Sequence, residues 1–145
     1  MKRIFMVEDN EDHALLIRRG IEDGSCVVAH YRDGLDFLKD CKEIQAHDSR
    51  PDLILLDLKL PGMDGFEVLK HLKAIKTFGQ VPVVILTTSQ RREEIEKAYQ
   101  LGAAGYVVKS DDFGALMAKL RCVKDYWFQT VEISQPAQVA KVGGT

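Results

Sequence analysis

Residues 53–65 read LILLDLKLPGMDG, and this stretch decides the fold. Its four leading apolar residues, Leu53–Leu56, predict a strand buried on both faces, as in a parallel sheet that helices cover on both sides. Asp57 follows directly, and Pro61–Gly65 has the composition of a turn. The sequence therefore places a carboxylate at the end of a buried strand, a position that suggests a reactive group.

Four further apolar runs flank this strand, near residues 3–8, 26–30, 82–87 and 105–108. The five runs alternate with five stretches of helical character, so the pattern is a repeated strand and helix unit. The runs are continuously apolar rather than alternating, which is typical of strands covered on both faces. We predict an α/β fold with a doubly wound, five-stranded parallel sheet and five helices.

The helical stretches carry start and stop signals. Asn10 and Asp33 can cap the first two helices, and Asp64 with Glu67 resembles a capping box for the third. The fourth helix is expected between Ser89 and Gly102 and the fifth over about 111–128. Their predicted apolar positions are Ile95, Ala98, Tyr99 and Leu101 in the fourth and Phe113, Leu116, Met117, Leu120, Val123 and Trp127 in the fifth.

Composition excludes several classes of protein. The 145 residues are 46% hydrophobic and 29% charged, which fits one domain over residues 1–128 with a tail over 129–145. The net charge of -2 offers no basic stripe for nucleic acid, and no apolar stretch approaches the roughly 20 residues of a membrane span. Cys26, Cys41 and Cys122 show no zinc or redox spacing and are read as reduced thiols. We expect a cytoplasmic protein.

Polar residues end four of the predicted strands: Glu8 and Asp9, Asp57, Thr87, and Lys109. In an open parallel sheet the carboxyl ends of the strands form the ligand site, so these side chains should gather there. Three neighbouring carboxylates repel one another and can recruit a hard cation with oxygen ligands. We expect Mg²⁺.

This set of groups suits phosphoryl transfer, which needs a nucleophile in line, cations around the phosphoryl oxygens and a hydrogen-bond donor. Asp57 is the candidate nucleophile, Lys109 the cation and Thr87 the donor. The histidines are scattered without metal spacing and are given no role: His13, His30, His47 and His71.

The chain resembles the receiver domain of two-component response regulators over residues 1 to about 128. The motifs that carry the resemblance are VEDN at 7–10, LLDLKLPGMDG at 55–65, LTTS at 86–89 and GYVVK at 105–109. The resemblance implies a flavodoxin-like fold with strand order 2-1-3-4-5.

The resemblance also implies a function for the site. Asp57 would accept a phosphoryl group from a phosphohistidine, in a transfer that the domain itself catalyses. Mg²⁺ would be held by Asp9, Asp57, the carbonyl of Lys59 and, through water, Glu8. Thr87 and Tyr106 would then move, and Tyr106 would couple the site to the face formed by the fourth helix, fifth strand and fifth helix.

Within that family the chain is more similar to small single-domain regulators that partner phytochrome-type and other bacterial sensor kinases. The features are RPD at 50–52, TTS at 87–89 with Lys109-Ser110, and YWF at 126–128. The implied partners are a sensor histidine kinase or phosphotransfer protein, a downstream protein and a second copy of the chain. Trp127 could lie in that dimer contact or close the core. Ser110 replaces the usual proline, so the usual cis peptide is not enforced.

Lys59 and Ser89 follow Asp57 and Thr87 by two residues, at positions that border the water approaching the acyl phosphate in this family. We hypothesise that they set the lifetime of the phosphorylated state.

Three other functions compete with this one. A Mg²⁺-dependent phosphatase would usually carry a second Asp where this chain has Lys59. A phosphate-independent scaffold would have no need of Asp57, Thr87 and Lys109 together. A flavin-binding protein would want Gly, Ser or Thr donors after the first strand, where this chain is acidic.

Overall fold

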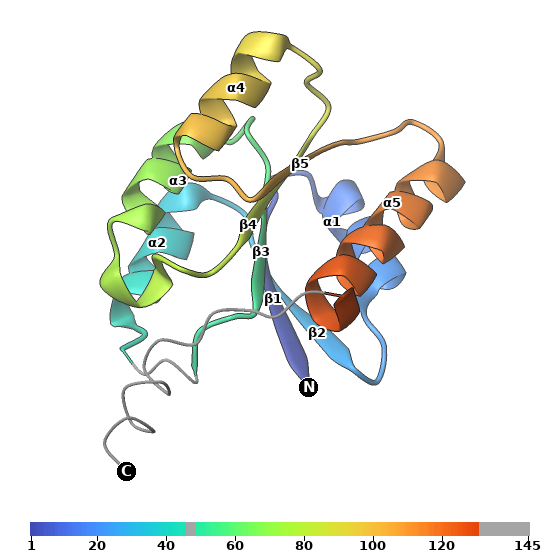
Figure 1. Cartoon of the computed structure of the whole chain (residues 1–145), viewed down its shortest axis with the longest axis horizontal. Helices are drawn as coiled ribbons and strands as arrows, with labels where there is room; N and C mark the ends of the chain where they lie inside the picture. The colour runs from blue at the N-terminus through green and yellow to red at the C-terminus, as the bar shows by residue number, and fades with distance from the viewer. Residues whose placement is uncertain (46–48, 131–145) are drawn as a thin grey trace.

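Five parallel strands form one sheet in the computed structural model, which describes residues 1–45 and 49–130 (Figure 1). The strand order, β2-β1-β3-β4-β5, confirms the predicted doubly wound, flavodoxin-like sheet. The chain order reverses between β1 and β3, and ligand sites of such sheets lie at this switch point. The strands are β1 (Lys2–Val7), β2 (Cys26–Tyr31), β3 (Leu53–Leu56), β4 (Val83–Thr87) and β5 (Gly105–Val108).

The helices begin where the sequence places capping side chains. Asn10 Oδ1 accepts a hydrogen bond from the His13 amide, and Asp33 and Asp64 cap α2 and α3 in the same way. These caps satisfy backbone amides that have no partner within the helix. The helical segments are α1 (Glu11–Ile21), α2 (Gly34–Glu43), α3 (Gly65–Lys73), η2 (Lys76–Phe78), α4 (Arg92–Gln100), α5 (Phe113–Asp125) and η3 (Tyr126–Thr130).

Helices cover both faces of the sheet and bury a hydrophobic core on each. Figure 1 shows α1 and α5 on one face and α2, α3 and α4 on the other. All four residues of β3 are fully buried, and they alternate between the two cores: Leu53 and Leu55 face α1 and α5, whereas Ile54 and Leu56 face the other layer. The continuous apolar run of residues 53–56 is therefore explained by burial on both faces.

Two residues that were predicted to lie in the core are exposed. Tyr99 of α4 is 49% exposed and Phe113, the first residue of α5, is 50% exposed. Within α4 only Ala98 is buried, because this helix contacts the sheet along a narrow stripe. The three cysteines are free thiols, and Cys122 is exposed whereas Cys26 and Cys41 are buried.

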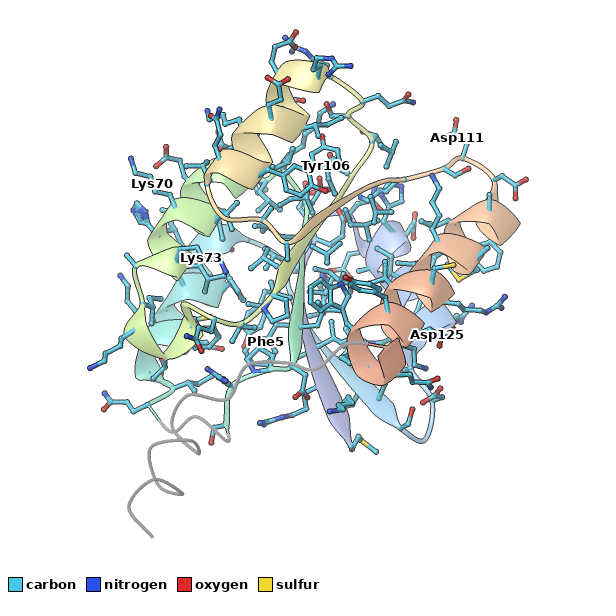
Figure 2. The ribbon with its side chains drawn as sticks, viewed as in Figure 1. Phe5, Lys70, Lys73, Tyr106, Asp111 and Asp125 are labelled. Atoms are coloured by element: carbon cyan, nitrogen blue, oxygen red, sulfur yellow. The ribbon has the colours of Figure 1, made fainter. Side chains whose placement is uncertain are left out.

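A lysine of α3 fixes the approach to β4. The Lys73 ammonium, labelled in Figure 2, donates to the carbonyl oxygen of Val81 at 3.1 Å, just before β4 begins. Burial lowers the pKa of this lysine. The chain is helical to Thr130, two residues beyond the predicted end of the last helix. The rest of the predicted tail, residues 131–145, and His47 lie outside the described residues.

Candidate functional site

The ends of β1, β3, β4 and β5 meet at one edge of the sheet. The backbone amide of Asp57 donates to the carbonyl oxygen of Val7 at 3.1 Å, which ties the residue after β3 to the end of β1. The amide of Lys109 donates to the carbonyl oxygen of Thr87 at 2.7 Å, and this bond ties the end of β5 to β4. The backbone thus brings the predicted site residues to one place.

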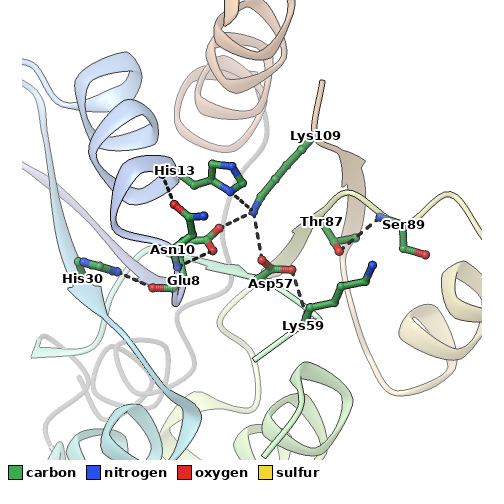
Figure 3. Close-up of polar contacts among 9 residues, drawn as sticks. All are labelled: Glu8, Asn10, His13, His30, Asp57, Lys59, Thr87, Ser89 and Lys109. Atoms are coloured by element: carbon green, nitrogen blue, oxygen red, sulfur yellow. Dashed lines mark hydrogen bonds and ion pairs between the residues drawn. The ribbon is translucent and has the colours of Figure 1, made fainter. Parts of the chain in front are cut away.

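Lys109 is the centre of this cluster (Figure 3). Its Nζ lies 2.5 Å from Glu8 Oε1 and 3.1 Å from Asp57 Oδ2, and the lysine side chain is only 6% exposed. Because both carboxylates are buried as well, water screens these charges far less than it would at the surface. Glu8 and Asp57 are therefore held together by one shared cation.

The carboxylates outnumber that cation. Glu8, Asp9 and Asp57 each offer an oxygen, and these oxygens lie within 4.8 Å of one another. Burial raises the pKa of Glu8, with the charge of Asp57 adding to the effect and Lys109 opposing it. Clustered carboxylate oxygens, one of them on the exposed Asp9, suit a hard divalent cation that keeps some of its water. The residues present therefore fit a divalent metal site.

The turn after β3 holds Asp57 in position. Gly65 begins α3, and its amide donates to the carbonyl oxygen of Leu58 at 2.9 Å. A Cβ atom at Gly65 would lie 2.3 Å from the carbonyl oxygen of Asp57, so no other residue fits without moving the backbone. Gly62 has a φ of +71°, which glycine adopts readily. The Lys59 amide donates to Asp57 Oδ1 at 3.2 Å and completes the turn.

Thr87 is fully buried at the end of β4, and its hydroxyl bonds to its own loop. Thr87 Oγ1 accepts a hydrogen bond of 3.5 Å from the Ser89 amide. The Ser89 hydroxyl in turn donates to Glu94 of α4 and accepts from the Arg91 amide. Figure 3 shows the Ser89 side chain pointing away from Asp57. The loop from β4 to α4 is thus closed by its own hydrogen bonds.

Tyr106 lies beneath α4 in Figure 2 and joins β5 to that loop. Its hydroxyl donates to the carbonyl oxygen of Ser89 at 3.0 Å. Burial, together with the charges of Glu94 and Asp57, raises the pKa of this phenol. Tyr106 therefore connects β5 with the loop that carries Thr87.

Two histidines that sequence reasoning left without a role contact the site. His13 Nδ1 lies 3.3 Å from Lys109 Nζ, and His30 Nε2 lies 2.7 Å from the carbonyl oxygen of Glu8. Metal-ligand spacing does not identify these histidines, because both act through hydrogen bonds and neither lies in the acidic cluster. Their position in the sequence was a better indication, at least for His13, which lies in the first helical turn after the acidic end of β1.

A cleft of about 600 Å³ opens beside Asp9. It lies on the β2 side of the site and is lined by Asp9, His30, Tyr31, Arg32, Asp33, Asp36 and Pro61. The carboxylate cluster is therefore reachable from solvent on this side, although Glu8 and Asp57 themselves are buried.

Comparison with known proteins decides the family. The model of the response regulator receiver domain matches residues 4–121. This chain belongs to that family. The receiver domain predicted from the four motifs is thus confirmed, and with it the assignment to the proteins of two-component signalling.

Relatives of this receiver domain include regulators of similar size. It is 36% identical over 133 residues to the probable methanogenesis regulatory protein FilR2 of Methanothrix harundinacea, covering 86% of this chain and 82% of the relative. It is 33% identical over 139 residues to the response regulator Rcp1 of Synechocystis sp., covering 91% and 92%.

Solved structures support the same placement. The phosphorylated cyanobacterial phytochrome response regulator RcpA superposes with a TM-score of 0.85 at 34% identity, covering 92% of this receiver domain and 99% of RcpA. The Mn²⁺-bound form of Rcp1 gives a TM-score of 0.83 at 30% identity, covering 93% and 100%. The predicted similarity to phytochrome-associated, single-domain regulators is confirmed.

Two further features of the receiver domain concern its backbone and its helices. The peptide bonds of the described residues are all trans, including the one after Lys109, where the sequence lacks proline. Among those residues no helix combines the length and the apolar character needed to cross a membrane.

Proposed function

We propose that this chain is a phosphoacceptor in which Asp57 takes a phosphoryl group from a phosphohistidine of a sensor histidine kinase or a phosphotransfer protein. The observation that carries the proposal is the buried contact of Lys109 with both Glu8 and Asp57. A lysine beside a candidate nucleophile supplies a fixed cation that can stabilise charge on the transferred phosphoryl group.

The negative charge of the cluster has to be offset before a phosphoryl group can approach. Asp9, Asp57, the carbonyl of Lys59 and, through water, Glu8 are the ligands we propose for Mg²⁺, and the mutual distances of the three carboxylates support the choice. When bound, Mg²⁺ would neutralise charge on the phosphoryl oxygens. Lys109 supplies the complementary cation from the other side of Asp57, through a side chain fixed by its contact with Glu8.

In the reaction, a carboxylate oxygen of Asp57 attacks phosphorus in line with the bond to the histidine nitrogen. The new P–O bond forms as the P–N bond breaks, and the departing imidazole keeps the electron pair and takes up a proton. Lys109 donates a hydrogen bond to a phosphoryl oxygen, and the same parts, with water as nucleophile, hydrolyse the acyl phosphate. We propose that Lys59 and Ser89 set the lifetime. The Ser89 side chain points away from Asp57 in this structure, so it would reach the path of that water only when its loop moves.

Readout of the phosphorylated state would pass through the loop after β4. Thr87 would give up its bond from the Ser89 amide and donate its hydroxyl to the phosphoryl group. Tyr106 is bonded to Ser89, so this loop movement reaches β5 and α4 directly. The exposed rings of Tyr99 and Phe113 lie on the helices that flank this face and support its role as the surface for a downstream protein.

The first test is intact mass spectrometry after incubation with acetyl phosphate and Mg²⁺. We expect a single phosphoryl adduct on the wild-type chain, none on Asp57→Asn and none when EDTA replaces Mg²⁺. Asp111→Asn is the matched control, because it removes an exposed carboxylate in the loop after β5 and should keep the adduct. Loss of both the adduct and Mg²⁺ binding in the wild type would instead favour a phosphate-independent scaffold.

A further inference from the structure

We propose that His13 is a positioning residue that holds the Lys109 ammonium for phosphoryl transfer. The inference rests on the proposed function and concerns a residue outside the acidic cluster. Its basis is the contact of 3.3 Å between His13 Nδ1 and Lys109 Nζ.

The ammonium has three N–H donors and no acceptor. Three partners surround it: Glu8 Oε1 at 2.5 Å, Asp57 Oδ2 at 3.1 Å and His13 Nδ1 at 3.3 Å. An ammonium can only donate, so in this contact Nδ1 of His13 would be the acceptor, in the tautomer with its ring N–H on Nε2. Every donor of Lys109 is therefore used in this arrangement.

His13 is itself fixed by a closed ring of contacts (Figure 3). Glu8 Oε2 accepts from the Asn10 amide at 3.2 Å, and Asn10 Oδ1 accepts from the His13 amide at 3.0 Å. The His13 ring then returns to Lys109, which contacts Glu8. The first turn of α1 and the end of β1 thus hold the lysine from two directions.

This ring leaves one N–H of Lys109 for the reaction. The bonds to Glu8 and His13 are anchored in β1 and α1, so they persist when Asp57 changes. The third N–H points at Asp57, where the phosphoryl group arrives. A donor fixed before the reaction needs no reorganisation during it, which is the source of its effect on rate.

His13 also occupies space beside a small cavity that reaches Lys109. This cavity, of about 170 Å³, lies between α1 and α5 and has both His13 and Lys109 in its lining. Removal of the imidazole would enlarge it next to the ammonium. More water there would weaken the attraction of Lys109 for the phosphoryl oxygens and let its side chain take other rotamers.

The test compares four full-length proteins in time courses of acetyl phosphate labelling with Mg²⁺: wild type, His13→Leu, His13→Asn and Leu16→Asn. We expect about a tenfold slower adduct formation in His13→Leu, the effect of one hydrogen bond to a charged group. Asn places an amide oxygen near the position of Nδ1 and should restore a rate close to wild type. Leu16 lines the same cavity without contacting Lys109, so its variant should also keep that rate.

A second readout is the NMR signal of the Lys109 ammonium protons, assigned by its loss in Lys109→Met. We expect a slowly exchanging signal in wild type and His13→Asn, and a broadened one in His13→Leu. If His13→Leu does not fold, His13→Ala takes its place, because it also removes the acceptor at the Nδ1 position. Equal labelling rates for wild type and the acceptor-less variant would overturn the role of His13 while leaving Asp57 as phosphoacceptor. No adduct on the wild type would defeat both proposals, whatever the ammonium signal shows.

Discussion

The hydroxyl of Tyr106 donates a 3.0 Å hydrogen bond to the backbone carbonyl oxygen of Ser89. This bond links β5 to the loop between β4 and α4, two residues beyond Thr87. Ser89 is bonded to Glu94 of α4 as well, so one residue connects the strand end, the neighbouring strand and the helix. A movement of Thr87 toward Asp57 would therefore also affect Ser89 and the two residues bonded to it, Tyr106 and Glu94.

Replacing Tyr106 with Phe removes the bond and keeps the ring. We expect the free energy of unfolding to fall by about 1 kcal/mol, the usual net contribution of one hydrogen bond. Urea unfolding measures the change, and acetyl phosphate labelling should proceed as in the wild type. A loss of labelling in Tyr106→Phe would mean that the hydroxyl acts in the chemistry of the site and not in its readout.

Lys109→Met should destabilise the protein in the absence of a divalent metal. It leaves Glu8 and Asp57 buried together without their cation, and breaking such a buried contact costs about 3–5 kcal/mol. Mg²⁺ should recover part of that loss by replacing the missing charge. Urea unfolding with Mg²⁺ and with EDTA measures both effects.

Lys119→Met is the matched control, since this lysine of α5 is exposed and donates to the carbonyl oxygen of Val108, away from the carboxylate cluster. Its stability should respond to Mg²⁺ as the wild type does. A metal-independent loss in Lys109→Met would argue that the carboxylates simply take up protons when the lysine is gone.

Asp9→Asn separates metal binding from stability. Asp9 is exposed, so its replacement should change the metal-free stability by no more than about 0.5 kcal/mol. In the wild type, Mg²⁺ at a hundred times its dissociation constant should add about 2.7 kcal/mol. We expect Asp9→Asn to lose most of that gain in thermal unfolding. An undiminished gain would place the metal away from Asp9.

The sequence predicted the residues that strand ends deliver, because topology alone brings them together. Asp57, Thr87 and Lys109 each follow a continuous apolar run, and parallel strands carry their ends to one edge. The helix caps at Asn10 and Asp33 were equally readable, since capping depends on residues close in the chain.

Contacts between side chains on different helices and strands could not be predicted from the sequence. The bond between His13 and Lys109 joins residues 96 positions apart, and it depends on how α1 is rotated on the sheet. Tyr99 and Phe113 were predicted to be buried because their spacing fits a helical stripe. Their exposure depends on how far α4 and α5 lie from their neighbours, which periodicity does not specify.

Replacing Lys59 or Ser89 should change the lifetime of the acyl phosphate. Lys59→Asn and Ser89→Glu alter the charge and size of the two side chains that we propose to control access of water, while Asp57 and Lys109 stay in place. We expect a change of several-fold in the rate of phosphate loss, on the scale of 1 kcal/mol in the barrier. Intact mass after removal of acetyl phosphate follows the decay. Gln90→Glu, on the same loop but exposed, should decay at the parent rate, and so would both variants if the hypothesis is wrong.

We expect one cysteine thiol of the folded protein to react with thiol reagents and two to be protected from them. Cys122 is exposed, whereas burial raises the pKa of Cys26 and raises that of Cys41 to about 12, with the charge of Asp40 adding at Cys41. Because the thiolate is the reactive form, a disulfide reagent should modify one thiol of the native protein quickly and all three only after unfolding. Fast modification of two or three thiols would show that the cores open readily.

The same shift predicts the behaviour of the protein in alkali. The folded state keeps the Cys41 thiol neutral to about pH 12, whereas the unfolded chain ionises near 9.0, so folding is favoured fully below pH 9 and the contribution is lost as the pH rises toward 12. The slope should be at most about 1.4 kcal/mol per pH unit for this group. Tyrosines such as Tyr31, whose pKa burial also raises, titrate in the same range. Cys41→Ala distinguishes the contribution of Cys41 from that of the tyrosines. The cavity left by the substitution lowers the free energy of unfolding equally at every pH, whereas the missing thiol makes the decline in that free energy above pH 9 shallower. A parallel decline in both proteins would assign the alkaline sensitivity to the tyrosines.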